Sequence, residues 1–273
     1  GFKGAPKFPM PNSLDFLLRY GYQFKDTKVA AYLNNTLTKI AYGGIYDPIA
    51  GGFSRYAVDE KWHIPHFEKM LYDNAQLVSI YAKAYIVNKN DLYKEVVIAS
   101  LNFIKEELTA ENGAFYASLD ADSKNKLGEK EEGAFYEWTE AELQLILGSD
   151  FELFKDFYNI NSYGFWEKEK YVLIRNSSKT AFAAKHKLSL FALNDKINTW
   201  KKTLKTARNK RSKPNLDDKV LTSWNALMIQ GYVDAYRAFG NLEYLEMALK
   251  NANFIIEKQR RRDGGLNRNF KNG

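Results

Sequence analysis

The chain has 273 residues and a formal net charge of +7, with 45% hydrophobic, 27% charged and 15% aromatic residues. This is an ordinary globular composition, long enough for one large domain or two small ones. The absence of cysteine excludes disulfides, zinc–thiolate sites and thiol redox chemistry within these residues.

Neither a membrane span nor a signal peptide is visible in the sequence. No apolar run reaches the ~18 residues that a spanning helix needs, and the first residues, GFKGAPKFP, lack an apolar signal core. We therefore expect a cytoplasmic protein without a membrane partner. Because the chain does not begin with Met, we also expect a processed or cut protein.

Much of the positive charge lies in one stretch, with a second cluster at Arg260–Arg262. The stretch contains Lys196, Lys201, Lys202, Lys205, Arg208, Lys210, Arg211 and Lys213. Nucleic-acid binding would need adjacent stacking aromatics or a known motif, and neither is present. We interpret the stretch as a solvated helix face and expect no nucleic-acid partner.

In chain order, apolar residues at helical spacing predict a series of helices. The first two cover about 13–21 and 27–42, and Gly43-Gly44 ends the second. The next begins near Pro65, which suits a first helical turn, and runs to about 87, followed by one over 91–112. Further helices are predicted from Thr139 to about 159, over 189–211, from an Asp217 or Asp218 cap to 239, and over 244–259.

Short strands are predicted between these helices. GGFSRYAV alternates as a strand, and the segments AFYAS and AFYEW predict a hairpin with a charged tip. A further strand is predicted around 171–174.

The stretch from Gly43 to Gln76 is the most informative part of the sequence. It reads GGIYDPIAGGFSRYAVDEKWHIPHFEKMLYDNAQ and holds two of the three histidines. Its first twenty or so residues have no helical repeat, and loops this long are usually functional or disordered. Disorder does not fit so many aromatic residues, so we expect an ordered loop that bears a site.

A faint internal repeat is present. Predicted helices are followed by the segments YGGIYD, ENGAFYA and DGGLNRNF. The distance along the chain from the second segment to the third is about twice that from the first to the second, which predicts one degenerate copy between the second and the third. Helix pairs with elaborated loops stack side by side into superhelices or rings. We therefore predict one all-α domain over 1–273, an incomplete α/α toroid with short hairpins in its loops.

Several blocks together resemble the spermatogenesis-associated protein 20 family, often catalogued as thioredoxin domain-containing proteins. They are APKFP, the stretch from Gly43 to Leu77, the DADS and EGAFYEWT segments, and DDKVLTSWNALMI. The resemblance implies that a thioredoxin-like domain precedes APKFP and is a partner of this part. It also implies the start of an (α/α)6 barrel similar to six-hairpin glycosidases and N-acylglucosamine 2-epimerases, truncated at both ends. A fold likeness of this kind defines the architecture more closely than the function.

The catalytic candidates are groups that can exchange protons. On the predicted helix, His66 lies on one face with Asp73, and Glu68 on the neighbouring face with Tyr72. Burial beside aromatic residues would raise a carboxyl pKa for acid catalysis. The candidate set is His66, Glu68, Asp73, Asp120 and Asp218. The alternative is that these groups are hydrogen-bonded anchors of the loop.

The substrate-binding candidates are polar and aromatic residues near the loops. They are Asp47, Phe53, Arg55, Tyr56, Trp62, Tyr72, Trp138, Trp224 and Asn225. Flat rings can stack on sugar faces, although core packing is the default role of a tryptophan.

Metal chemistry is a weaker interpretation. His63 and His66 lack the helical i, i+4 spacing and have no further ligand nearby. Asp120, Asp122 and Glu131 resemble a calcium loop, but Asn125 replaces its glycine. Asp217-Asp218 lacks the third acid of a prenyl-diphosphate magnesium motif. We therefore expect no metal and no cofactor.

We predict a carbohydrate-active enzyme, a sugar epimerase or isomerase or a glycoside hydrolase, with a small-molecule substrate bound at the Gly43–Pro65 loop. The alternative is a non-catalytic barrel that binds a ligand or partner for an attached redox domain.

Overall fold

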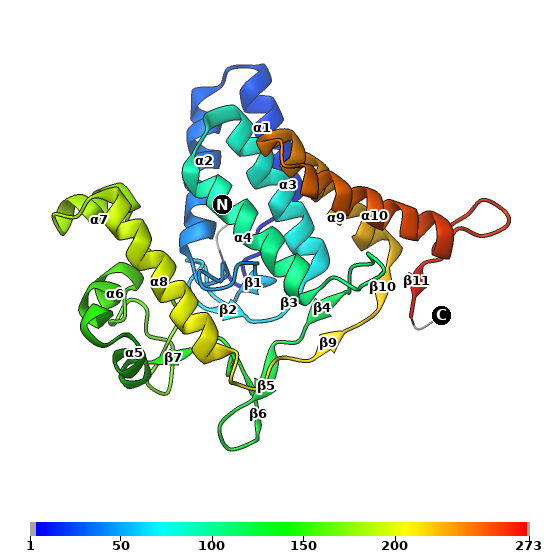
Figure 1. The fold of residues 1–273 in the computed structure, drawn as a ribbon. Coiled ribbons are helices and arrows are strands. Elements are labelled where there is room, and N and C mark those ends of the chain that lie inside the picture. Colours follow the sequence, from blue (N-terminus) through cyan, green and yellow to red (C-terminus); the bar gives the residue numbers. More distant parts are fainter. Residues whose placement is uncertain (1–3, 272–273) are drawn as a thin grey trace.

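The computed structural model describes residues 4–271, and helices dominate it (Figure 1). The helices are α1 (Pro11–Gln23), α2 (Thr27–Tyr42), α3 (Leu71–Asn88), α4 (Asp91–Glu107), α5 (Glu140–Leu147), α6 (Phe151–Tyr158), α7 (Lys179–Lys185), α8 (Leu190–Arg208), α9 (Thr222–Phe239) and α10 (Leu242–Gln259), with the 3-10 turn η1 (Gly148–Asp150). The strands are β1 (Tyr56–Ala57), β2 (Pro65–His66), β3 (Lys69–Met70), β4 (Ser118–Leu119), β5 (Asp122–Lys124), β6 (Lys130–Glu132), β7 (Trp138–Thr139), β8 (Lys170–Tyr171), β9 (Leu216–Asp217), β10 (Val220–Leu221) and β11 (Asn269–Phe270).

Three helical hairpins, α1–α2, α3–α4 and α9–α10, form the main array. α3 packs on α1, α4 and α9, so most of its side chains are buried, whereas α2 and α10 are amphipathic. The core between these helices includes Leu37, Tyr81 and Met228. The predicted all-α class, with helices in pairs and only short strands in the loops, is confirmed.

The four helices α5–α8 lie to one side of this array (Figure 1). They enclose a separate hydrophobic cluster that includes Trp138, Phe154 and Trp200. α9 follows them in sequence but packs directly along α3. We predicted a degenerate copy of the repeat between the second and third copies. That prediction is wrong, because α5–α8 lie beside the array of helix pairs and not within it.

Equivalent contacts show an internal repeat of two copies, but its first copy is the GGF segment at 51–53 and not the predicted YGGIYD. Asn74 in α3 accepts a hydrogen bond from the Phe53 N–H (2.7 Å) and donates one to the Phe53 carbonyl (3.0 Å). Asn225 in α9 does the same for Phe115, at 2.8 and 2.9 Å. In each copy an asparagine of one helix therefore holds a glycine turn. Asn74 of α3 holds the turn in the loop after α2, and Asn225 of α9 holds the turn in the loop after α4. We call α3 and α9 the inner helices. Gly52 in the first turn has φ +80°, and its backbone lies against the ring of Phe103 where a Cβ would not fit.

Short strands gather at the end of the array where α3 and α9 begin (Figure 1). β3, β4 and β9 form a three-stranded sheet, in which Lys69 pairs with Leu119 and Ser118 pairs with Asp217. β1 pairs with β2, and β10 with β11. Segments from the first, second and last thirds of the chain thus meet at this end.

Two predicted helix starts are wrong because strand pairing takes their residues. The helix expected from Pro65 begins at Leu71, since Pro65–His66 and Lys69–Met70 are β2 and β3. Asp217 belongs to β9, and Leu221 rather than an aspartate occupies the N-cap of α9.

The charged hairpin exists but uses other residues. β5 and β6 form an antiparallel pair in which Asp122 lies opposite Glu132 and Lys124 lies opposite Lys130. AFYAS and AFYEW do not pair with each other: Ser118 and Trp138 belong to different sheets. The Thr139 cap is confirmed, since its hydroxyl accepts a hydrogen bond from the Glu142 N–H.

Candidate active site

Five residues converge at the N-terminal ends of α3 and α9, and we call them the inner-helix site: Arg55, Glu68, Tyr72, Asp73 and Trp224. The Arg55 Nε–H donates to the Tyr72 hydroxyl at 2.9 Å, and an Arg55 terminal nitrogen lies 3.4 Å from a Glu68 oxygen. The Tyr72 and Trp224 rings pack with centroids 4.8 Å apart. All five were predicted from sequence as catalytic or binding residues.

Local structure explains how these side chains meet. Glu68 directly precedes β3 and Lys69 begins it, and successive side chains of an extended chain point to opposite sides. Glu68 accordingly meets Arg55, whereas Lys69 meets Asp47. Tyr72 and Asp73 occupy the first turn of α3, which β3 leads into directly.

Asp73 is a buried carboxyl of this site. The residue is 6% exposed, and its Oδ2 atom has no hydrogen-bond partner within residues 4–271. Burial raises the pKa of Asp73 to about 7, although the Arg55 charge and the Tyr72 hydroxyl oppose the rise. A carboxyl of this kind can donate and accept a proton near neutral pH.

His66 borders the inner-helix site from β2 rather than from a helix. Its Nδ1 lies 2.7 Å from a Glu132 oxygen, and its Nε2 lies 4.0 Å from Glu68. The Tyr56 ring stacks on the imidazole at 4.8 Å. The predicted helical face joining His66 to Asp73 is wrong, but the sheet places His66 beside Glu68. Glu132 was missed, because only the β5–β6 hairpin brings it there.

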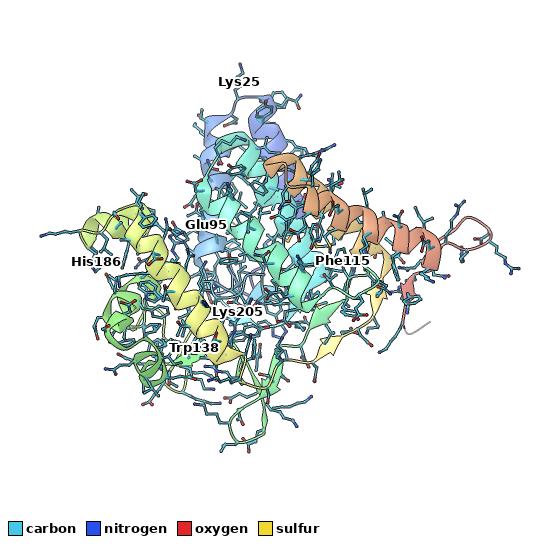
Figure 2. All side chains as sticks on the ribbon, in the orientation of Figure 1. Lys25, Glu95, Phe115, Trp138, His186 and Lys205 are labelled. Atoms are coloured by element: carbon cyan, nitrogen blue, oxygen red, sulfur yellow. The ribbon has the colours of Figure 1, made fainter. Side chains whose placement is uncertain are left out.

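Other sequence candidates lie apart from this site. Phe53 is fully buried against Tyr46 and Tyr81, and Asn225 holds the second glycine turn. Trp138 packs in the α5–α8 cluster, far to one side of Phe115 (Figure 2).

The remaining candidates lie in loops. Trp62 is 6% exposed, with the Lys7 ammonium over its ring. Asp120 accepts a weak hydrogen bond (3.4 Å) from the Asp122 N–H. Asp218 forms an exposed ion pair with Lys271 at 2.7 Å.

Asp47 belongs to a buried ion cluster with Lys69 and Arg208. Lys69 Nζ lies 2.9 Å from Asp47 Oδ2, and Arg208 binds both carboxylate oxygens at 3.1 and 2.9 Å. Although burial opposes ionisation, Arg208 and Lys69 hold the pKa of Asp47 well below its ordinary value. The two cations were missed because the pairing spans up to 161 positions.

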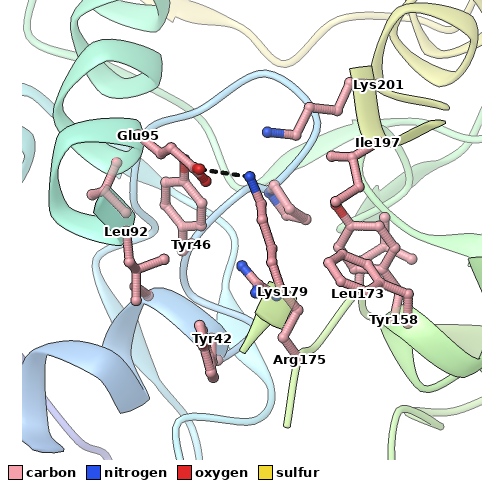
Figure 3. Close-up of a pocket in the computed structure, with 15 residues that line it drawn as sticks. Tyr42, Tyr46, Leu92, Glu95, Tyr158, Leu173, Arg175, Lys179, Ile197 and Lys201 are labelled. Carbon is pink, nitrogen blue, oxygen red and sulfur yellow. Dashed lines mark hydrogen bonds and ion pairs between the residues drawn. The ribbon is translucent and has the colours of Figure 1, made fainter. Parts of the chain in front are cut away.

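The prediction that the basic stretch is a solvated face is correct only in part, because Lys202, Lys210 and Lys213 are exposed whereas Arg208 is buried. Five of its cations pair with acids on other elements, namely Lys196–Asp150, Lys205–Glu106, Arg208–Asp47, Arg211–Glu142 and Lys213–Glu107. Lys179 on α7 similarly reaches Glu95 on α4 at 2.5 Å, across a small pocket that Lys201 and Arg175 also line (Figure 3). The pairs of Lys179, Lys205, Arg208 and Lys213 attach α7, α8 and the segment after α8 to α4 and to the Asp47 loop. Asp150 and Glu142 belong to the α5–α8 group itself, so their pairs hold that group together.

Neither a metal cluster nor a membrane span is found in the described part. Within 4–271 no group of three or more His, Asp or Glu side chains could hold a metal ion. Glu131 of the suspected calcium loop is paired with Lys168 and Lys170. No helix between 4 and 271 is long and apolar enough to cross a membrane.

Solved structures give partial likenesses in helix arrangement. The chain is 10% identical to a family 76 glycoside hydrolase (mannosidase) of Bacteroides thetaiotaomicron, with a TM-score of 0.48 over 93% of this chain and 45% of that one. It is 12% identical to a cellobiose 2-epimerase of Bacillus thermoamylovorans, with a TM-score of 0.39 over 99% and 82%. At scores below 0.5 these likenesses carry no inference about function.

Sequence comparison gives closer relatives. The chain is 35% identical to spermatogenesis-associated protein 20 of Mus musculus and 34% identical to that of Homo sapiens, over 93% of its own length and 35% and 36% of theirs. An uncharacterised protein of Caenorhabditis elegans is 36% identical over 93% of the chain and 38% of that protein. No family model matches. The chain thus spans well under half the length of these relatives. Over 93% of its residues it is related to the spermatogenesis-associated protein 20 family, which confirms the resemblance that the motifs indicated.

Proposed function

We propose that the inner-helix site performs acid–base catalysis on a carbohydrate, in a sugar epimerase, isomerase or glycoside hydrolase. The observation that carries the proposal is the pair of unlike carboxyls in one cluster. Asp73 is buried and holds its proton to about pH 7, whereas Glu68 is a quarter exposed and paired with Arg55. Two carboxyls in contrasting environments can serve as acid and base in one reaction.

In this proposal, Asp73 is the general acid. Its raised pKa keeps a transferable proton available near neutral pH, where an ordinary aspartic acid would have lost it. Glu68 and His66 lie on the strand side of the site, with His66 Nε2 4.0 Å from a Glu68 oxygen. They are the bases that would accept a proton from a sugar carbon or from an attacking water.

The remaining groups support a carbohydrate as the substrate class. Sugars present apolar ring faces and hydroxyl groups together, so their sites combine aromatic side chains with carboxylates and guanidinium groups. Tyr72 and Trp224 supply the aromatic surface, and Arg55 supplies donors. The side chain of Arg55 is 40% exposed, so the cluster is open to solvent at the Arg55 edge.

The test is turnover of a panel of mono- and disaccharides in ²H₂O, followed by proton NMR. Deuterium at the carbon next to the carbonyl would indicate an epimerase or isomerase, and new reducing ends would indicate a hydrolase. We expect Asp73→Asn to lower the rate at least a hundredfold, while the exposed control Asp195→Asn keeps it. Saturable sugar binding without turnover would support the non-catalytic alternative.

A further inference from the structure

Lys69, the sequence neighbour of Glu68, lines a cavity whose chemistry differs from that of the inner-helix site. Its volume is about 200 Å³, and its walls include Lys69, Arg208, Phe103, Phe135 and Tyr136. We call it the Asp47 cavity, because Asp47 forms part of its floor. It has no role in the acid–base proposal above.

The floor of the Asp47 cavity holds more positive than negative charge. Lys69 and Arg208 are 2% and 3% exposed, and both bind the single carboxylate of Asp47. The rim adds no net charge to this excess, because Lys205 and Lys213 are neutralised by Glu106 and Glu107. A buried cation without an equivalent anion is unfavourable. Burial and the Arg208 charge accordingly lower the pKa of Lys69, although Asp47 opposes the shift, and a further anion would compensate the excess charge.

Polar and aromatic groups around these cations have bonding capacity left. The Arg208 Nε atom and the Tyr136 hydroxyl have no hydrogen-bond partner among residues 4–271. The Lys69 ammonium lies 4.5 Å from the Phe103 ring centroid, and the Arg208 guanidinium lies 5.1 Å from that of Phe135. The cavity thus combines a cationic floor with flat apolar walls.

We propose that the Asp47 cavity binds a small organic anion, with a carboxylate or phosphate directed toward Arg208 and Lys69 and a flat apolar part against Phe103 and Phe135. A guanidinium and an ammonium together suit either acidic group. Bound charge there compensates the excess cation, and the aromatic walls exclude water from the pair.

Two ring-bearing probes, benzoate and phenyl phosphate, test the proposal and distinguish the two acidic groups, with benzyl alcohol as the uncharged control. Isothermal titration on the 273-residue chain should show binding of at least one anion, and at least tenfold weaker binding of the alcohol. Equal binding of the alcohol, or no anion binding at millimolar concentration, would overturn the proposal.

Variants then locate the bound anion. Arg208→Met and Lys69→Met each leave Asp47 with one partner, so the buried charge is balanced, and each should weaken anion binding at least tenfold. Should neither variant fold, Lys213→Ala at the rim should still weaken it two- to threefold. Lys196→Ala, which only releases Asp150, and Asp73→Asn at the inner-helix site should bind like the wild type. Wild-type affinity for the anion in Arg208→Met or in Lys69→Met would contradict the assignment. If neither of these variants folds, wild-type affinity in Lys213→Ala would contradict it.

Discussion

Replacing Asp73 by asparagine is expected to stabilise the protein at alkaline pH while removing activity. In the folded chain the pKa of Asp73 is raised from 3.8 to about 7. Above that range, burying the charged carboxylate opposes folding, because the unfolded chain ionises the group freely. Asparagine has nearly the same shape and carries no charge, so it escapes this penalty.

The magnitude follows from the two pKa values. Each pH unit between 3.8 and about 7 corresponds to about 1.4 kcal/mol, so the full difference is about 4 kcal/mol. The folded state binds the proton more tightly, so the contribution of Asp73 is most favourable below pH 3.8 and is lost as the pH rises through about 7. Asp73→Asn should therefore gain up to about 4 kcal/mol over the wild type at pH 8.

Urea unfolding at pH 5 and pH 8 measures this difference. At pH 5 the free energies of unfolding of the wild type and Asp73→Asn should differ less than at pH 8, because the Asp73 carboxyl of the folded wild type is still protonated. Asp195→Asn, on the exposed face of α8, is the matched control and should show no such pH dependence. A wild type and an Asp73→Asn variant with parallel pH profiles would refute the burial argument.

Two further predictions concern stability. Asp47→Asn leaves the buried Lys69 and Arg208 cations without their carboxylate, so its free energy of unfolding in urea should fall by about 3–5 kcal/mol; a loss below 1 kcal/mol would indicate that the cluster relaxes into water. Asn225→Ala removes three hydrogen bonds to backbone groups. Its melting temperature should fall by an amount that corresponds to a loss of about 2–3 kcal/mol in the free energy of unfolding. Gln230 is exposed on the same helix, so Gln230→Ala should change that free energy by no more than about 0.5 kcal/mol. Equal melting temperatures for the two alanine variants would contradict the role given to Asn225.

Local patterns predicted helices well where both ends carry a signal. α2 runs from Thr27 to Tyr42 as predicted, because its apolar repeat is bounded by Gly43. α3 was placed too early, because Pro65 is a good first-turn residue in isolation. Only pairing of Lys69 and Met70 with β4, about fifty positions along the chain, shows that this segment is extended.

The candidate site was predictable in its members but not in its geometry. Arg55, Glu68, Tyr72 and Asp73 lie within one short stretch, so composition alone pointed to them. Their roles depend on which strand face each side chain takes, and on α9 packing directly on α3 across the inserted helices. Lys69 was missed for the same reason, because the alternation of side chains along the extended chain directs it away from Glu68 and toward Asp47.

The protonation of Asp73 is the most direct test of the acid–base account. Carbon-13 NMR of labelled side-chain carboxyls, recorded from pH 4 to pH 9 on the wild type and Asp73→Asn, identifies this resonance by its loss in the variant. If Asp73 is the general acid, its carboxyl resonance should titrate near pH 7. A resonance that titrates near pH 4 would mean that Asp73 is an ordinary ionised carboxylate, and the proposed general acid would be lost.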